Sequence, residues 1–184
     1  MIARLRAVDG RADGGFGMLE LIVSMTMLNV GILAIVAAFN SGALAIQRAA
    51  DVSTASVVGD KQMELYRAVK HTEIALDATA VATANQDATY QCDTANKIDP
   101  AGACGGANQA AAITRTCATP TPQCSPRQTV TGPDQDTYLL DTYIVWQTPP
   151  TGRPVKLVTI VVRKPGAARA LARVSSTFDE SSGL

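Results

Sequence analysis

The chain has 184 residues, a formal net charge of zero and only 17% charged residues. This length suits one modest domain with an appendage, and the balanced charge gives no indication of a nucleic-acid-binding surface or of a strongly acidic partner. Aromatic residues make up 4% of the chain, so a large aromatic core is not expected.

The first 15 residues form a short, mildly basic segment that ends in two glycines. Its charged residues are Arg4, Arg6, Asp9, Arg11 and Asp13. An ordinary secretory signal has its apolar stretch before the cleavage site, whereas here the glycines precede the apolar stretch. Cleavage after Gly15 would therefore leave the apolar segment on the mature protein. The positive-inside tendency predicts that this basic leader stays cytoplasmic and that the bulk of the chain lies outside.

An apolar segment of membrane-spanning length follows, and a single charge stands at its start. Between residues 21 and 38 the polar residues are Ser24, Thr26 and Asn29, and this is about the length needed to span a bilayer core. After Glu20 no charged residue occurs before Arg48. A lone carboxylate at the centre of a membrane helix costs roughly 2.5–3.5 kcal/mol, so Glu20 is expected to need a cationic partner. A plain signal anchor, in which Glu20 has no role, is the alternative.

The combination of Gly15, Phe16 and Glu20 with a long apolar helix resembles the prepilin motif of type IV pilins and pseudopilins. The match covers about residues 15 to 45, and residues 27 to 34 resemble the corresponding part of minor pilins. The resemblance implies that a prepilin peptidase cuts between Gly15 and Phe16 and then N-methylates Phe16, whose amine stays cationic. It also implies that Glu20 pairs with this amine on a neighbouring subunit during assembly. Pairing within one chain is open as well, because the two residues are four apart.

One long helix is predicted over residues 16–71, with its transmembrane part at about residues 18–40. Ala34, Ala38 and Gly42 recur at intervals of four, and such a stripe of small residues permits close approach of another helix. The alternative is that alanine is simply common here. In the half of this helix outside the membrane, one apolar arc is expected to face the core of the exterior domain. Its members are Ala55, Val58, Leu65, Tyr66 and Val69.

Residues 72–135 are predicted to be a variable loop region with short strands near residues 88–92 and 113–117. It contains all four cysteines of the chain: Cys92, Cys104, Cys117 and Cys124. Their spacing does not match paired zinc ligands, and clustered cysteines in an exported domain favour disulfides over free thiols or a metal site. Four cysteines permit three pairings. Cys92–Cys104 and Cys117–Cys124 are preferred because they are sequence neighbours.

Residues 136–179 are predicted to form an antiparallel meander of three strands, followed by a flexible tail at 180–184. The strands are expected at residues 138–147, 155–163 and 170–178, separated by proline- and glycine-containing turns. A long helix packed on a small antiparallel sheet satisfies the layer rule. The expected fold class is therefore α+β, with a pilin-like architecture.

No enzymatic site, cofactor or metal site is predicted. His71, the only histidine, stands where the long helix should end, and a basic residue there complements the helix carboxyl terminus more often than it acts in catalysis. Asp134 and Asp136 could bind calcium, but two acids are a weak ligand set. A polar turn is the preferred interpretation.

The expected function is that of a structural subunit, of the minor-pilin kind, of a type IV pilus or related filament. The resemblance implies three kinds of partner: other pilin subunits, the prepilin peptidase and an inner-membrane assembly platform. The chain is expected to cross the cytoplasmic membrane once before it enters a periplasmic or extracellular filament. Two alternatives remain open: a pseudopilin of a type II secretion or DNA-uptake system, and a single-pass anchored binding domain that never polymerises.

Overall fold

The computed structural model describes residues 17–96, 111–119, 121–150 and 152–180. The predicted leader, the cut site between Gly15 and Phe16, Cys104 and nearly all of the predicted tail lie outside the described residues. The chain divides into two compact units, residues 1–47 (unit 1) and residues 48–184 (unit 2).

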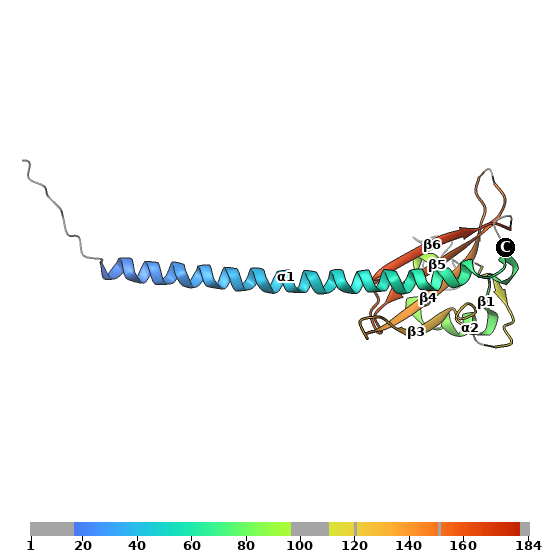
Figure 1. Ribbon diagram of the computed structural model, residues 1–184, viewed down its shortest axis with the longest axis horizontal. Helices are drawn as coiled ribbons and strands as arrows, with labels where there is room; N and C mark the ends of the chain where they lie inside the picture. The colour runs from blue at the N-terminus through green and yellow to red at the C-terminus, as the bar shows by residue number, and fades with distance from the viewer. Residues whose placement is uncertain (1–16, 97–110, 120, 151, 181–184) are drawn as a thin grey trace, which may run out of the picture. The chain divides into compact units, whose positions relative to one another are not determined.

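Helix α1 is a single helix of 50 residues, Met18–Arg67 (Figure 1). It confirms the predicted long amino-terminal helix and is slightly shorter than expected at both ends. The backbone N–H groups of Glu20 and Leu21 donate to the Gly17 carbonyl in its first turn, at 2.9 and 3.2 Å. The helix has ended by Lys70, whose backbone is extended with φ −63° and ψ 146°. A short 3₁₀ turn, η1 (His71–Glu73), follows.

Unit 2 is built around a four-stranded antiparallel sheet with strand order β3-β4-β5-β6. The strands are β3 (Arg127–Thr131), β4 (Thr137–Gln147), β5 (Val155–Arg163) and β6 (Ala172–Phe178). The last three strands are the predicted meander, and β5 has the predicted bounds. Strand β3 corrects two expectations. The sheet has four strands instead of three, and the added strand lies within the segment predicted as loop. Its only aliphatic residue is Val130, so the strand has no apolar alternation in its sequence.

The segment between α1 and the sheet contains fewer strand residues than predicted. Strand β1 (Leu76–Asp77) pairs in parallel with β2 (Thr114–Arg115), so the strand expected at residues 113–117 is present over two residues. Helix α2 (Ala78–Ala84), helix α3 (Ala88–Gln91) and the 3₁₀ turn η2 (Thr94–Asn96) lie between them in sequence. The strand predicted at residues 88–92 is wrong. Asp87 caps a helix there, because its carboxylate accepts the N–H groups of Thr89 and Tyr90.

The main core lies between α1 and one face of the sheet. Its buried residues include Ala55, Val58, Met63 and Tyr66 of α1 with Tyr138, Leu140, Ile144, Val158, Ile160 and Val162 of the sheet. Three members of the predicted arc are therefore in the core, while Leu65 and Val69 are half-buried. Gly59 lets α1 approach the sheet closely, because a Cβ built there would lie 3.0 Å from Val174 Cγ2.

The opposite face of the sheet carries a second, smaller core under α2 and α3. Ala84 and Tyr90 pack there against Tyr143 and Val161. The Tyr90 and Tyr143 rings stack with their centroids 4.5 Å apart. Unit 2 therefore buries both faces of its sheet, α1 on one and the α2–α3 segment on the other.

Candidate functional site

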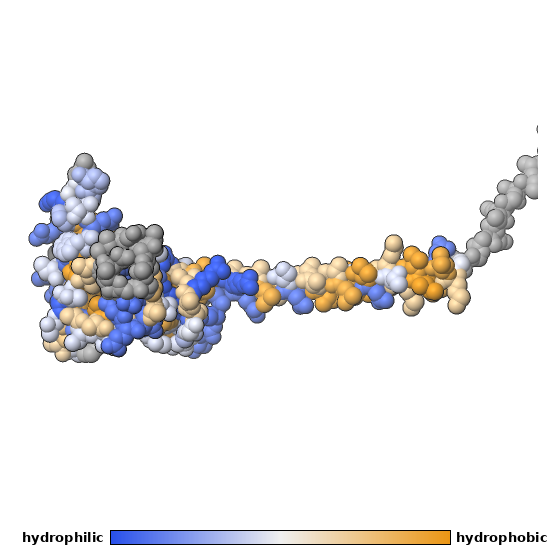
Figure 2. Space-filling model, turned by 180° about the vertical axis from the view of Figure 1, so that it is seen from behind, coloured by the Kyte–Doolittle hydropathy of each residue, from blue (hydrophilic) through white to orange (hydrophobic). Residues whose placement is uncertain are grey.

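The part of α1 in unit 1 carries an apolar surface that nothing in the described residues covers. Its large apolar side chains, from Met18 to Ile46, are between 45% and 86% exposed. Figure 2 shows this surface as the largely orange part of the helix. The helix is long and apolar enough to cross a membrane. Since soluble monomers rarely expose contiguous apolar surface on this scale, it is compatible with single-pass membrane anchoring.

Glu20 lies in the first turn of α1, and its side chain is exposed. No hydrogen bond or ion pair of the Glu20 carboxylate is present within the described parts of the chain. The helix amino terminus is a favourable place for a carboxylate, because unpaired N–H groups and the helix dipole give it partial positive charge. The Phe16 amine, which is the predicted partner, and Gly15 lie outside the described residues. The ion pair therefore stays a prediction.

The predicted small-residue stripe lies on exposed α1 surface in unit 1. Ala38 and Gly42 line a hollow of about 470 Å³ together with Ile35, Phe39, Ala43 and Ile46. No side-chain or backbone atom lies within 4 Å of the Cβ position of Gly42. The hollow provides space for close contact with another helix, and the packing role of Ala34, Ala38 and Gly42 stays a prediction.

A disulfide joins Cys117 and Cys124, with 6.5 Å between their Cα atoms. This is one of the two pairings preferred from the sequence. Cys92 is also disulfide-bonded. The expected Cys92–Cys104 pair involves Cys104, which is not among the described residues.

The loop closed by Cys117 and Cys124 is held against α1. Gln62 Nε2 donates to the Pro122 carbonyl at 2.8 Å, and Tyr66 Oη donates to the Gln123 carbonyl at 2.9 Å. The buried face of α1 thus satisfies backbone carbonyls of this loop as well as packing on the sheet. The disulfide and these two bonds together fix a segment of poor sequence periodicity.

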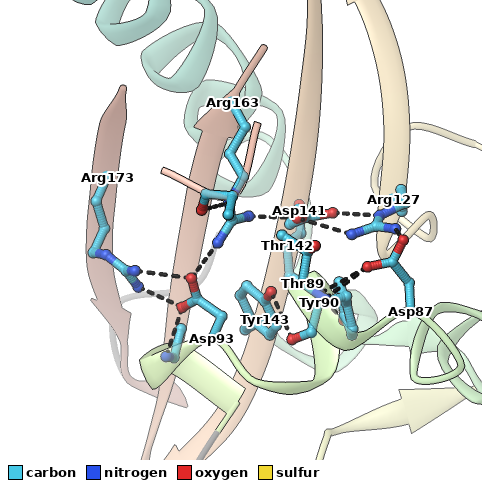
Figure 3. A network of polar contacts seen from close by, with 12 residues as sticks. Asp87, Thr89, Tyr90, Asp93, Arg127, Asp141, Thr142, Tyr143, Arg163 and Arg173 are labelled. Carbon is cyan, nitrogen blue, oxygen red and sulfur yellow. Dashed lines mark hydrogen bonds and ion pairs between the residues drawn. The ribbon is translucent and has the colours of Figure 1, made fainter. Parts of the chain in front are cut away.

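Six side chains of alternating charge form a network on the face of the sheet opposite α1, and the sequence alone did not predict it. In order of contact they are Asp87, Arg127, Asp141, Arg163, Asp93 and Arg173 (Figure 3). Each strand of the sheet contributes one member, and the α3 segment contributes Asp87 and Asp93. We call this set the charged network. Because its members come from separate elements and alternate in sign, it is neutral as a whole and ties the α3 segment to all four strands.

The centre of the charged network is buried and its ends reach solvent. The Asp141 and Arg163 side chains are 0% and 3% exposed, whereas Asp87 is 48% exposed. Arg127 Nε donates to Asp141 at 2.6 Å, and Arg163 also pairs with Asp141 and with Asp93. At the exposed end, the hydrogen bond from Arg127 lowers the pKa of Asp87 to about 2.

Two tyrosines pack beside the charged network and are satisfied by backbone carbonyls. Tyr90 Oη donates to the Thr142 carbonyl at 2.9 Å, and Tyr143 Oη donates to the Tyr90 carbonyl at 3.0 Å. Burial raises the pKa of both phenols well above the ordinary range. The arrangement holds a helical segment on a sheet.

Asp134 and Asp136 lie together with Asp51, and a lysine joins them. Carboxylate oxygens of the three residues lie within 4.8 Å of one another. Lys164 Nζ donates to Asp51 at 2.9 Å and to Asp136 at 3.2 Å. Asp134 accepts the Tyr138 hydroxyl at 2.5 Å. Asp51 thus adds a third carboxylate to the two acids considered from the sequence, and the Lys164 ammonium group places a positive charge beside Asp51 and Asp136. The interpretation of residues 134–136 as a polar turn stays a prediction.

His71 lies after the end of α1, as predicted, and its imidazole lies near Trp146, with ring centroids 6.4 Å apart. Its Nε2 is buried and has no hydrogen-bond partner among the residues that the structure describes. Lys156 Nζ donates to the carbonyls of His71 and Ile74, at 2.7 and 2.9 Å. Burial lowers the pKa of Lys156. This lysine therefore caps the turn after α1, a role that its position inside β5 did not indicate in the sequence.

Comparisons with protein-family models, with curated proteins and with solved structures found no match to this chain. Its function is therefore inferred from its own residues and their geometry. An α+β chain with a long apolar amino-terminal helix packed on a small sheet is compatible with a pilin-like fold.

Proposed function

We propose that this chain is a structural subunit, of the minor-pilin kind, of a type IV pilus or a related filament. The observation that carries the proposal is the uncovered apolar surface of α1 in unit 1, with Glu20 as the only charge between residue 18 and Arg48. The Gly15–Phe16–Glu20 motif supports the same function, because its resemblance to prepilins implies removal of the leader directly before this helix.

In the proposed cycle, the apolar surface of α1 changes its surroundings. It lies in the cytoplasmic membrane before assembly and is covered by helices of neighbouring subunits afterwards. Glu20 then pairs with the methylated Phe16 amine of a neighbour. In a medium of low dielectric constant an unpaired carboxylate is costly, so subunits in the wrong register are disfavoured. The disulfide-containing unit 2 supplies the outward-facing surface of the filament.

The proposal is tested by mass spectrometry of the mature amino terminus together with recovery of surface filaments. We expect the mature chain to start at methylated Phe16. We also expect Glu20→Ala to be processed normally but to be depleted from sheared filaments. Glu64→Ala is the matched control, because Glu64 is an exposed acid on the same helix and pairs with the exposed Arg67 at 2.5 Å.

The outcomes separate the proposal from its alternatives. A mature chain that starts at Met1 would show an anchored domain that is not a prepilin. Processed chain that stays in the cell envelope, without surface filaments, would favour a pseudopilin. Normal incorporation of the Glu20→Ala subunit would refute the registry role of this carboxylate.

A further inference from the structure

Asn29 is the one strongly polar side chain in the central part of the apolar α1 surface, and no described residue pairs with it. The other polar side chains nearby satisfy themselves on their own helix. Ser24 Oγ donates to the Glu20 carbonyl at 2.7 Å, and Thr26 Oγ1 donates to the Val23 carbonyl at 2.8 Å. The Asn29 amide makes no hydrogen bond within the parts of the chain that the structure describes, and its side chain is exposed.

The position of Asn29 along α1 makes this amide costly in a membrane. Asn29 is nine residues after Glu20, which corresponds to about 13.5 Å at about 1.5 Å per residue. With Glu20 at one boundary of a hydrocarbon core about 30 Å thick, Asn29 lies close to the midplane. No water is available there, and an amide without a hydrogen bond is unfavourable in hydrocarbon. Asn40, about 30 Å from Glu20 by the same arithmetic, lies at the opposite boundary, where water can hydrate it.

Asn29 also belongs to a seven-residue repeat of large side chains. Alternating steps of three and four residues connect Ile22, Met25, Asn29, Ile32, Val36 and Phe39, and we call this set the Asn29 seam. Each of its apolar members is at least 50% exposed in the single chain. The seam contains no charge and omits the small residues Gly31, Ala34 and Gly42. A single asparagine at one core position of such a repeat fixes register and the number of helices in parallel coiled coils.

We propose that the membrane-anchored chain associates with a second copy of itself through the Asn29 seam, before any filament forms. Copies with the same topology place Asn29 at the same depth. The amide group offers both donors and an acceptor, so two Asn29 side chains satisfy each other across parallel helices. Any other partner would need its own polar group at this depth. The proposal rests on the membrane anchoring inferred above, and not on pilus assembly.

The test uses the full chain in detergent micelles and in phosphatidylethanolamine–phosphatidylglycerol vesicles. Flotation with the vesicles measures anchoring, and sedimentation equilibrium in micelles measures association. We expect Asn29→Leu to float normally and to dimerise roughly 3- to 30-fold more weakly, which is the range for hydrogen bonds between membrane helices. Asn40→Leu is the matched control, because it removes the same amide near the boundary, and we expect its dimerisation to be unchanged. Asn29→Gln, which keeps an amide, should retain the dimer.

Oxidative cross-linking tests the geometry of the dimer. The described cysteines are all in disulfides, so an introduced cysteine supplies the reactive thiol. Ile32→Cys, in the Asn29 seam, should cross-link efficiently, and Ala34→Cys, on another face of α1, should not. A chain that floats but stays monomeric, or an Asn29→Leu variant that dimerises like the parent, overturns this proposal alone. A chain that does not float refutes the membrane anchor, and this proposal with it.

Discussion

At the scale of single residues, the charged network has the most demanding chemistry in unit 2. Burying Arg163 and Asp141 removes both from water, a cost of several kcal/mol per ion unless strong pairing replaces the lost hydration. The alternation of aspartates and arginines provides this pairing. Arg163 lies between Asp141 and Asp93, and Asp141 lies between Arg163 and Arg127. Each buried charge therefore has two opposite neighbours.

Removing the central cation should destabilise unit 2. We expect Arg163→Met to lower the free energy of unfolding by about 3 kcal/mol, near the low end for breaking a buried pair, since Asp141 and Asp93 each keep one arginine. Urea denaturation of the full chain in detergent, followed by near-ultraviolet circular dichroism, measures the loss. Arg153→Met is the control, because Arg153 is 72% exposed in its pair with Asp179 and such pairs contribute about 0–1 kcal/mol. Equal losses in the two variants would contradict a special role for the charged network.

At the scale of elements, the sequence predicted the parts of the fold whose residues follow one simple period. The long helix, β4 and β5 are strongly apolar or regularly patterned, and they occur close to the predicted positions. Strand β3 was not predicted, because its pairing with β4, and not its own composition, makes it a strand. The strand predicted near residues 88–92 is instead helix α3, because the Asp87 cap and the burial of Tyr90 favour a helical turn.

The candidate sites divide in the same way. The apolar surface and the Cys117–Cys124 pair could be predicted, because each is local in sequence. The charged network could not, because Asp93 and Arg173 are 80 positions apart and only the folded sheet brings them together. The partner of Asp136 was missed for the same reason, since Lys164 lies 28 positions after it.

The contact between α1 and the sheet depends on Gly59. A larger side chain would meet Val174 Cγ2 and Val162 Cγ2, which lie 3.0 and 3.4 Å from the Cβ position. We expect Gly59→Leu to lower the free energy of unfolding by about 1–3 kcal/mol, the usual cost of overpacking a core. Thermal unfolding followed by far-ultraviolet circular dichroism measures this loss. Gly42→Leu, which adds the same atoms where no neighbour lies within 4 Å, should leave the unfolding of unit 2 unchanged.

At the scale of the whole molecule, the two units depend on different surroundings. Unit 2 buries its apolar residues between its own elements, and its phenols are part of that core: Tyr66, Tyr90, Tyr138 and Tyr143 are at most 2% exposed. None of the large apolar residues described in unit 1 is buried, so lipid or protein neighbours must cover them. The stability of the chain in solution is therefore a property of unit 2.

This burial predicts how unit 2 responds to alkali. Burial raises the pKa of Tyr66 and of Tyr138 to about 12, while a phenol in the unfolded chain titrates near 10. The unfolded state therefore loses protons first, and stability falls as the pH rises from about 10 towards 12, by about 1.4 kcal/mol per pH unit for each phenol that stays protonated in the folded state. The lowered pKa of Lys156 opposes this slope only below its ordinary value of 10.5. Hydrogen bonds to Asp51 and Asp136 raise the pKa of Lys164, which adds to the fall in stability above that value.

Urea denaturation at a series of pH values from 9 to about 11.5 measures the slope. Tyr138→Phe should reduce it by about 1.4 kcal/mol per pH unit, because one titrating phenol is removed. A slope that does not change in this variant would contradict the assignment of the effect to buried phenols.

The placement of the aromatic residues has an optical consequence. All four tyrosines and the single tryptophan of the chain follow residue 47, so unit 1 has no indole or phenol chromophore. Tyrosinate absorbance should therefore not appear in moderate alkali until unit 2 unfolds. Tryptophan emission reports on Trp146 alone. Events at the apolar helix, such as insertion into lipid or contact with another copy, can therefore be followed with a dye placed on unit 1, while the intrinsic spectrum reads the integrity of unit 2 in the same sample.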